Sequence, residues 1–235
     1  MSLYVIGDLH LSLSEKVDKP MDIFGDKWEN HADRLRANWC LSENDTAVIL
    51  GDVSWAMNFS ELEEDFAFIN ALPGKKLIVK GNHDYWWETL KKMRRFAEKY
   101  PTIDFVHNNS YLVDGVNVCG TRGWIAEPNE PCDEKVLNRE LGRLKLSLES
   151  VKNPLEKVVF LHYPPMYFNV RCEEIMNILK THGVSRCYYG HLHGKAHKGA
   201  IEGEREGIFL KCVSADYVSF APVLVQKTAQ SNNEK

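Results

Sequence analysis

Residues 80–84, Lys80-Gly81-Asn82-His83-Asp84, are the stretch around which this sequence is organised. They follow the apolar run Leu77-Ile78-Val79, which is typical of a short buried strand, and precede a helix-like segment at residues 86–100. An amide, an imidazole and a carboxylate therefore stand on the turn where a strand ends. In open α/β sheets, ligands bind at that end of the strands. Taken alone, the stretch is explained equally well by turn chemistry, because Asn and Asp are common turn residues.

Four other apolar runs end in residues of the same kinds. Their ends are Gly7-Asp8-Leu9-His10, Gly51-Asp52, His162-Tyr163-Pro164-Pro165 and Gly190-His191-Leu192-His193-Gly194. In the Asp-x-His and His-x-His pairs, alternate residues of an extended backbone project to the same side, so each pair can hold neighbouring metal positions. The preceding glycines favour tight turns and close backbone approach. A single pair of this kind is usually a surface feature, but five such strand ends together predict a metal site.

The spacing of apolar residues predicts an α/β fold. Strand-like and helix-like runs alternate in the first half, as in βαβ units, and short strand-like runs separated by Asn-Asn and Asp-Gly follow in the middle. A second set of strands and helices occupies the remainder. We expect two mixed sheets with helices outside, in one domain at residues 1–227, and a frayed polar tail at 228–235. The expected strands are 2–7, 46–51, 76–80, 103–107, 110–114, 116–120, 157–161, 186–190, 207–213 and 219–226. The expected helices are 27–40, 60–71, 86–99, a Leu-spaced helix through 137–148, and 171–182.

Bulk composition excludes several classes of protein. The chain has 235 residues, of which 44% are hydrophobic and 26% charged, as in soluble globular proteins. Its net charge of -4 gives no support to a long nucleic acid or an anionic membrane as partner. No apolar run approaches the ~18 residues of a membrane span, and no signal-peptide pattern opens the chain, so we expect a cytoplasmic location. The six cysteines form no CxxC pair and are expected to be reduced thiols: Cys40, Cys119, Cys132, Cys172, Cys187 and Cys212.

The candidate ligands supply nitrogen and oxygen atoms without thiolate, which suits Mn, Fe, Zn, Ni or Co. The strand ends offer seven candidate ligands, which is more than one ion needs. Two divalent metal ions that share a bridging carboxylate would use all seven. Such a pair can activate a bridging water and hold both oxygens of an in-line displacement at phosphorus.

The five strand ends resemble the signature of the calcineurin-like metallophosphoesterase superfamily, D-x-H, GD, GNH[DE], H and GH-x-H, in order over residues 3–194. The resemblance implies a four-layer α/β/β/α sandwich and a metal-dependent phosphoesterase that uses a metal-bridging hydroxide without a phospho-enzyme. It also implies one metal held by Asp8, His10 and His193, a second held by Asn82, His162 and His191, and Asp52 bridging them. His83 would contact the phosphate and protonate the leaving group instead of binding metal.

Departures from the superfamily signature narrow the range of expected substrates. Phosphoprotein phosphatases of the superfamily carry GD-x-x-DRG, whereas residues 51–57 here read Gly-Asp-Val-Ser-Trp-Ala-Met. This difference argues against that branch. It also leaves the carboxylate partner of His83 unidentified. We expect Asp84 to stabilise the turn. The lipid A enzyme of the superfamily is similar at residues 7–10 but typically has Arg in place of His83.

Two further classes of protein share this fold. One is a nuclease, which usually carries additional domains, and the other is a non-catalytic scaffold, which tends to lose ligands. This chain has neither the length for such domains nor a missing ligand. A small-molecule phosphoester is therefore the expected substrate, with diesters favoured.

Several residues near the motifs keep two interpretations. The aromatic side chains beside the motifs either pack in the core and rim or form a stacking surface for a flat leaving group. Arg122 either meets a phosphate oxygen or forms a surface ion pair. His197 is expected to be solvated. The aromatic residues are Trp55, Tyr85, Trp86, Trp87, Trp124 and Tyr163.

Overall fold

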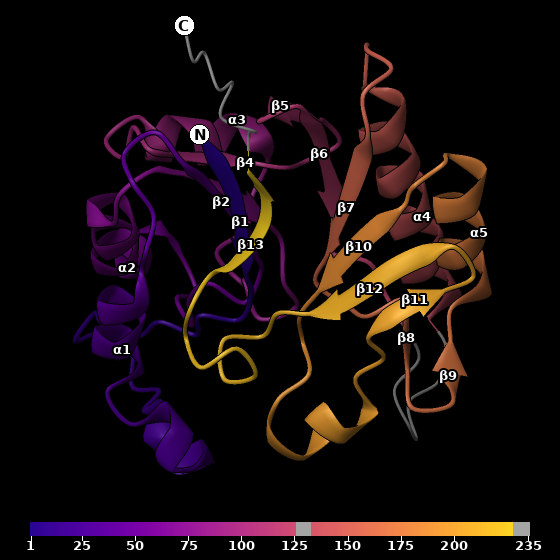
Figure 1. Cartoon of the computed structure of the whole chain (residues 1–235). Helices are drawn as coiled ribbons and strands as arrows, with labels where there is room; N and C mark the ends of the chain where they lie inside the picture. The colour runs from indigo at the N-terminus through magenta and orange to yellow at the C-terminus, as the bar shows by residue number, and fades with distance from the viewer. Residues whose placement is uncertain (126–132, 228–235) are drawn as a thin grey trace, which may run out of the picture.

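The computed structural model describes residues 1–125 and 133–227 and contains two large sheets with helices on their outer faces (Figure 1). The first sheet has the strand order β13-β1-β2-β3-β4, in which β1 to β4 are parallel and β13 is antiparallel to β1. Its strands are β1 (Ser2–Ile6), β2 (Thr46–Leu50), β3 (Lys75–Val79), β4 (Ile103–Phe105) and β13 (Val223–Lys227).

The second sheet has the order β11-β12-β10-β7-β6-β5, with four parallel central strands and an antiparallel strand at each edge. Its strands are β5 (Tyr111–Val113), β6 (Val116–Thr121), β7 (Lys157–Leu161), β10 (Arg186–Tyr189), β11 (Gly203–Arg205) and β12 (Ile208–Cys212). A small ribbon, β8 (Met166–Tyr167) and β9 (Val170–Arg171), lies outside both sheets.

Successive residues along each strand bury their side chains on opposite faces of the sheet. This produces three hydrophobic layers between four layers of secondary structure. In β2, Ala47 and Ile49 pack toward the helices, whereas Val48 and Leu50 pack toward the other sheet. The outer helices are α1 (His31–Asn38), α2 (Phe59–Ala71) and α3 (Leu90–Ala97) on the first sheet, and α4 (Glu134–Glu149) and α5 (Glu173–Thr181) on the second. The predicted α/β/β/α sandwich is confirmed.

Three predicted boundaries were wrong by four residues. The helix predicted at 27–40 begins at His31, after two 3₁₀ turns, η1 (Met21–Phe24) and η2 (Asp26–Trp28), because Asn30 is left-handed with φ 48°. The helix predicted from residue 86 begins at Leu90, where Thr89 caps it by accepting a hydrogen bond from the Lys92 amide. The last strand begins at Val223 because Ser219 and Phe220 are left-handed.

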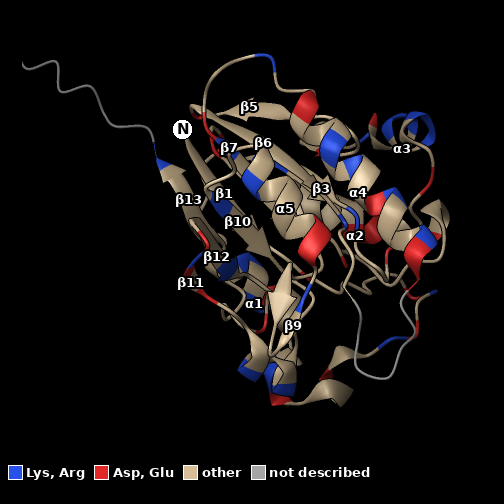
Figure 2. Ribbon diagram, turned by 90° about the vertical axis from the view of Figure 1, so that its right-hand side faces the viewer, with Lys and Arg blue, Asp and Glu red and all other residues tan. Residues whose placement is uncertain are grey.

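The predicted tail at 228–235 and Cys132 lie outside the described residues, and the other five cysteines are free thiols. Among residues 1–125 and 133–227, no helix has both the length and the apolar character needed to cross a membrane. Figure 2 shows Lys and Arg interspersed with Asp and Glu along α4 and α5, so these helices present no surface of a single charge sign.

The two sheets meet at the carboxyl ends of their parallel strands. The Gly7 amide after β1 donates to Val213 O after β12 at 2.8 Å, and the Ala215 amide donates back to Gly7 O at 2.9 Å. On either side, the Asp8 amide donates to Gly51 O and the Gly190 amide donates to His162 O, both at 3.0 Å. These bonds bring four of the five predicted strand ends to one place, and the Asp52 amide joins the fifth by donating to Asp84 Oδ2 at 3.0 Å.

Candidate metal centre

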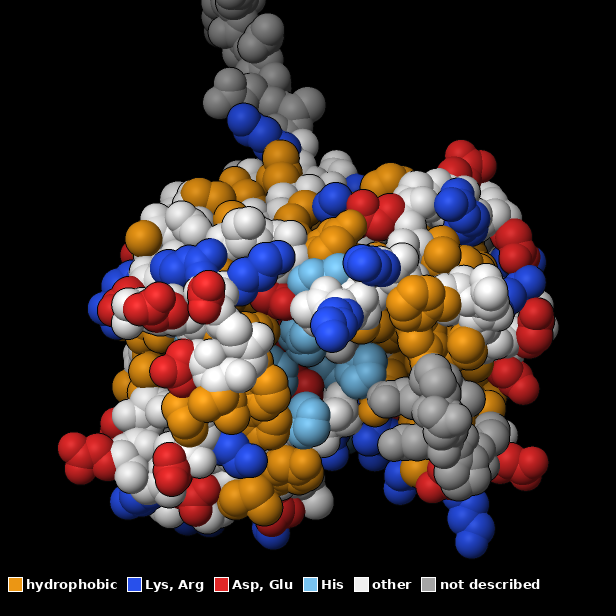
Figure 3. Space-filling view, turned by 90° about the horizontal axis from the view of Figure 1, so that it is seen from below, with side chains coloured by type: hydrophobic (Ala, Val, Ile, Leu, Met, Phe, Trp, Pro, Cys, Tyr) orange, Lys and Arg blue, Asp and Glu red, His pale blue; other side chains and the backbone are white. Residues whose placement is uncertain are grey.

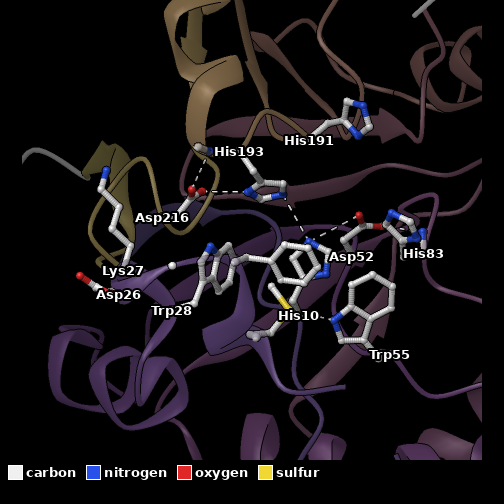
Figure 4. A pocket seen from close by; sticks show the side chains of 14 residues that line it. His10, Asp26, Lys27, Trp28, Asp52, Trp55, His83, His191, His193 and Asp216 are labelled. Carbon is white, nitrogen blue, oxygen red and sulfur yellow. Dashed lines mark hydrogen bonds and ion pairs between the residues drawn. The ribbon is translucent and has the colours of Figure 1, made fainter. Parts of the chain in front are cut away.

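The structure brings all seven predicted metal ligands and His83 together at the junction of the two sheets. Asp8, His10 and His193 form one group in which ligand atoms lie within 4.8 Å of one another, and Asp8, Asp52 and His162 form a second. Figure 4 shows His10, Asp52 and His193 converging from different strand ends, with His83 and His191 nearby.

The first group has the spacing of ligands around one ion. His10 Nε2 lies 3.3 Å from His193 Nε2, and His193 Nε2 lies 3.5 Å from Asp8 Oδ1. Two donors that each sit ~2.1 Å from a metal in tetrahedral geometry are about 3.4 Å apart. The donor atoms, their spacing and their burial therefore fit a divalent ion.

Asp52 lies between this group and the residues predicted to hold the second ion. Its Oδ2 is 3.7 Å from His10 Nε2 and 3.6 Å from His162 Nε2. On the far side, Asn82 Oδ1 lies 2.6 Å from His162 Nε2 and 3.1 Å from His191 Nδ1. This is the placement that a bridging carboxylate between two metal positions requires.

Hydrogen bonds to the rear nitrogens orient two of the histidines. His162 Nδ1 lies 2.8 Å from Leu50 O, to which it can only donate, so Nε2 is left free to face Asp52 and Asn82. His193 Nδ1 lies 2.8 Å from Asp216 Oδ1, and its Nε2 faces Asp8 and His10. A metal-ligating histidine is usually held by such a bond through its other nitrogen.

The sequence analysis missed Asp216, which the structure places directly behind His193. It is 3% exposed and also accepts hydrogen bonds from the Gly194 amide at 3.1 Å and from His197 Nε2 at 3.2 Å. The prediction that His197 is solvated is therefore wrong, because its ring hydrogen-bonds to the buried carboxylate of Asp216. The available signal was Ser214-Ala215-Asp216 after β12, one more strand that ends in a carboxylate.

Backbone strain is concentrated at the predicted ligands. Four of them, Asp8, His10, Asp52 and His191, have left-handed φ values of 60°, 46°, 46° and 71°. Each such non-glycine residue costs on the order of 1 kcal/mol, and strain of this kind gathers at functional sites. Gly81 shows why glycine precedes the ligands: a Cβ there would lie 2.1 Å from the Asp52 nitrogen.

Asp84 stabilises the turn, as predicted, and also joins two strand ends. Its carboxylate accepts hydrogen bonds from the Gly81 amide at 2.7 Å and from the Asp52 and Val53 amides at 3.0 and 2.9 Å. Its Oδ1 also accepts from Trp86 Nε1 at 3.1 Å. Asp84 therefore fixes the position of Asp52 relative to Asn82.

Burial sets the electrostatics of the centre. It raises the pKa of Asp52 to about 6, together with the negative charge of Asp8, and it raises the pKa of Asp84 to about 7. Burial lowers the pKa of His162 to about 4. His193 is different: despite burial, its hydrogen bonds to Asp216 and Asp8 raise its pKa to about 10. Buried carboxylates without enough positive charge are costly, so the site favours cations.

His83 lies beside the centre, not within either group of ligands. Its backbone amide donates to Asp52 Oδ1 at 2.8 Å, and its Nδ1 lies 3.2 Å from the hydroxyl of Tyr85. Its ring lies 4.7 Å from that of Trp55. Within residues 1–125 and 133–227, no carboxylate hydrogen-bonds its ring, so Tyr85 takes the place of the carboxylate partner that the sequence left unidentified.

Five of the six motif-flanking aromatic residues pack in or against the hydrophobic cores, two of these also contact predicted ligands, and Tyr85 is exposed. Trp86, Trp87 and Trp124 pack against the hydrophobic cores. Trp55 stacks on His10 with ring centroids 5.0 Å apart, and Tyr163 contacts His191 at 4.2 Å.

Arg122 belongs with the packing residues. Its side chain is 16% exposed, and its Nη2 lies 3.7 Å from Oε1 of the buried Glu140. This position favours the ion-pair interpretation over contact with a phosphate, although the pair is largely buried, not on the surface.

A cavity of about 520 Å³ opens in front of the first group of ligands. Figure 3 shows it as a hollow at the centre of this face, with histidines in its floor and hydrophobic side chains along one side. Its volume is in the range of small-molecule sites. Besides His10, Asp52, His83, His191, His193 and Asp216, it is lined by residues of η1 and η2 and by Trp55.

Comparisons with known proteins agree with this geometry. The sequence pattern of calcineurin-like phosphoesterases matches residues 1–195, so the chain belongs to that family. Membership of this family supports hydrolysis of phosphoesters as the class of reaction. The family typically binds divalent metals. A comparison with curated protein sequences finds no match.

Three solved structures share the fold at low sequence identity. A phosphopantetheinyl hydrolase from Mycobacterium tuberculosis has a TM-score of 0.58 at 12% identity, covering 97% of each chain. A protein of unknown function from Aquifex aeolicus has a TM-score of 0.51 at 16% identity, covering 95% of each chain. TT1561 of Thermus thermophilus has a TM-score of 0.51 at 14% identity, covering 95% of this chain and 97% of that one.

Proposed function

We propose that this protein is a dinuclear metal-dependent phosphoesterase that hydrolyses small organic phosphoesters, with diesters favoured over monoesters and phosphoproteins. One observation carries the dinuclear assignment: Asp52 lies 3.7 Å from His10 and 3.6 Å from His162, between two sets of nitrogen and oxygen donors. Two divalent ions there, of Mn, Fe, Zn, Ni or Co, would activate a water for direct attack and neutralise phosphate oxygens.

The residues of the chain supply the rest of the mechanism. Asp8, His10 and His193 would hold one ion, Asn82, His162 and His191 the other, and Asp52 both. In the imidazolium form both ring nitrogens of His83 carry a proton: Nδ1 donates to the Tyr85 hydroxyl, and Nε2 can deliver its proton to the leaving oxygen, which leaves a neutral imidazole. The phosphoryl group passes directly to water, without a phospho-enzyme.

Four observations support the substrate preference. Residues 51–57 lack the GD-x-x-DRG pattern of phosphoprotein phosphatases. Among the described residues that line the cavity, Lys27 is the one lysine or arginine, which disfavours polyanionic substrates. A diester also needs its leaving oxygen protonated, which suits the position of His83. The phosphopantetheinyl hydrolase among the structural neighbours is compatible with a small organic phosphoester.

The dinuclear assignment is tested with Asp52→Ala. Because this carboxylate faces both groups of ligands, the variant should lose both metals or nearly all activity. Elemental analysis and turnover of a chromogenic ester measure the two outcomes. Unchanged activity would exclude a bridging role for Asp52.

The substrate preference is tested separately, by kcat/KM for bis-nitrophenyl phosphate, nitrophenyl phosphate, cyclic nucleotides and a phosphopeptide, with Mn, Zn or Fe supplied. Phosphopeptide turnover that exceeds the diesters by more than about tenfold, roughly 1.4 kcal/mol of transition-state preference, would overturn it while leaving the metal assignment intact.

A further inference from the structure

The cavity in front of the metal centre is strongly asymmetric. One side consists of the predicted ligands, and the other is apolar and comes from η1, η2 and Trp55. Met21, Phe24, Trp28 and Trp55 are its apolar members. The charged side chains on the η2 side are Asp26 and Lys27, whose charges are opposite, and the Lys19 ammonium lies over the Trp55 ring, 5.4 Å from its centroid.

The apolar wall is built onto the ligands themselves. The ring of Trp28 lies 5.6 Å from that of His10 and 5.5 Å from that of His193, edge-on to both. Trp55 stacks on His10, and its Nε1 lies 3.2 Å from Met21 Sδ. Figure 4 shows Trp28 and Trp55 flanking His10. The wall is therefore held at a fixed place relative to the predicted ligands.

The position of His83 tells which part of the substrate would meet this wall. His83 lines the same cavity, and its ring contacts Trp55 at 4.7 Å. In the proposed function, His83 protonates the leaving oxygen. The group attached to that oxygen must then start beside His83 and Trp55, and the cavity is the space that can receive it.

We propose that this cavity is the leaving-group subsite, that it selects phosphoesters with flat apolar leaving groups, and that Phe24 is a specificity-determining residue. The inference rests on the proposed function and names its substrate class. Aromatic and apolar walls favour flat apolar groups through stacking and burial.

Phe24 offers a clean test because it lies at the rim and is 63% exposed, so its replacement does not open a hole in the core. Ile23 is the matched control: it belongs to the same 3₁₀ turn, is 71% exposed and is not among the described residues that line the cavity. The variants are Phe24→Ser, Phe24→Leu and Ile23→Ser. Metal content is measured for each.

The substrates are the phenyl and 2-naphthyl esters of methylphosphonic acid, whose leaving alcohols have similar acidity but different apolar area. We expect wild type to prefer the naphthyl ester by about tenfold in kcat/KM. Phe24→Ser should reduce that preference by about fivefold, Phe24→Leu should restore part of it, and Ile23→Ser should leave it as in wild type. An equal preference in wild type and Phe24→Ser would overturn the inference.

Binding provides a second readout that does not depend on turnover. Naphthylphosphonate, which cannot lose its naphthyl group by hydrolysis, should quench the fluorescence of Trp28 and Trp55 more strongly at a given concentration than methylphosphonate. Phe24→Ser should weaken the naphthylphosphonate interaction and Ile23→Ser should not. Failure of all proteins to hydrolyse either ester would contradict the proposed function, whereas equal naphthylphosphonate affinity in wild type and Phe24→Ser would contradict the subsite.

Discussion

Asp216 provides the most quantitative prediction, because it touches the proposed metal centre through a single ligand. Its Oδ1 lies 2.8 Å from His193 Nδ1, and the carboxylate is 3% exposed. Replacing Asp216 with Ala leaves the rear nitrogen of His193 without that acceptor and frees the ring to rotate. We therefore expect weaker metal binding at the position shared by Asp8, His10 and His193.

The size of the effect follows from the bond that is lost. A buried hydrogen bond to a charged group contributes roughly 1.5–3 kcal/mol. Since about 1.4 kcal/mol corresponds to tenfold in affinity, Asp216→Ala should raise the metal Kd by roughly 10- to 150-fold. Asp216→Asn should lose less, because an amide oxygen can still accept from His193 Nδ1.

The assay is competition for metal against a fluorescent chelator, with elemental analysis of the purified proteins. His197→Ala is the control, since His197 also binds Asp216, at 3.2 Å, but is not a predicted ligand. Circular dichroism establishes that each variant is folded. A folded Asp216→Ala that binds metal as tightly as wild type would refute the positioning role.

Three further predictions test other parts of the site. His83→Ala should retain metal but lose rate, more for alkyl leaving groups than for nitrophenolate, and equal losses across leaving groups in steady-state kinetics would contradict an acid role. Gly81→Ala should destabilise the protein by roughly 1–3 kcal/mol in denaturant unfolding, because its Cβ would lie 2.1 Å from the Asp52 nitrogen; an unchanged unfolding midpoint would contradict this. For the metal-free protein, burial raises the folded-state pKa of Asp52 and Asp65 to about 6 and of Asp84 to about 7. The free energy of unfolding that these three groups contribute is therefore full below the unfolded pKa of ~3.9 and is lost as pH rises through 6 to 7. Urea unfolding with chelator present should accordingly show a lower free energy of unfolding at pH 8 than at pH 5.

The sequence predicted the architecture because apolar strand-like runs and segments with helical spacing could be told apart and followed one another in a clear order. The apolar run in β2 was predicted as a strand, and the structure buries it on both faces, with Val48 and Leu50 toward the other sheet and Ala47 and Ile49 toward the helices. The candidate ligands were predictable because parallel strands deliver their carboxyl ends to one edge. Neither argument needed side-chain contacts.

What the sequence did not reveal depends on contacts between distant segments. Asp216 is a carboxylate at one more strand end, but no histidine or glycine stands beside it in the sequence, and the contact with His193 at 2.8 Å identifies its role. The apolar wall comes from two 3₁₀ turns at Met21–Phe24 and Asp26–Trp28, which are too short to leave a periodic signal. The left-handed conformations of Asp8, His10, Asp52 and His191 were likewise not predicted from the sequence.

The hydrogen bonds between motifs explain why the five strand ends occur together. Asp8 accepts from the His191 amide at 2.9 Å and Asp52 accepts from the His83 amide at 2.8 Å. Asp84 accepts from the Asp52 amide at 3.0 Å. Each carboxylate thus fixes the backbone of another motif, so the ligand positions are set by the fold before any cation arrives. The same arrangement buries several carboxylates close together, and divalent cations would provide the compensating charge that the surrounding side chains leave incomplete.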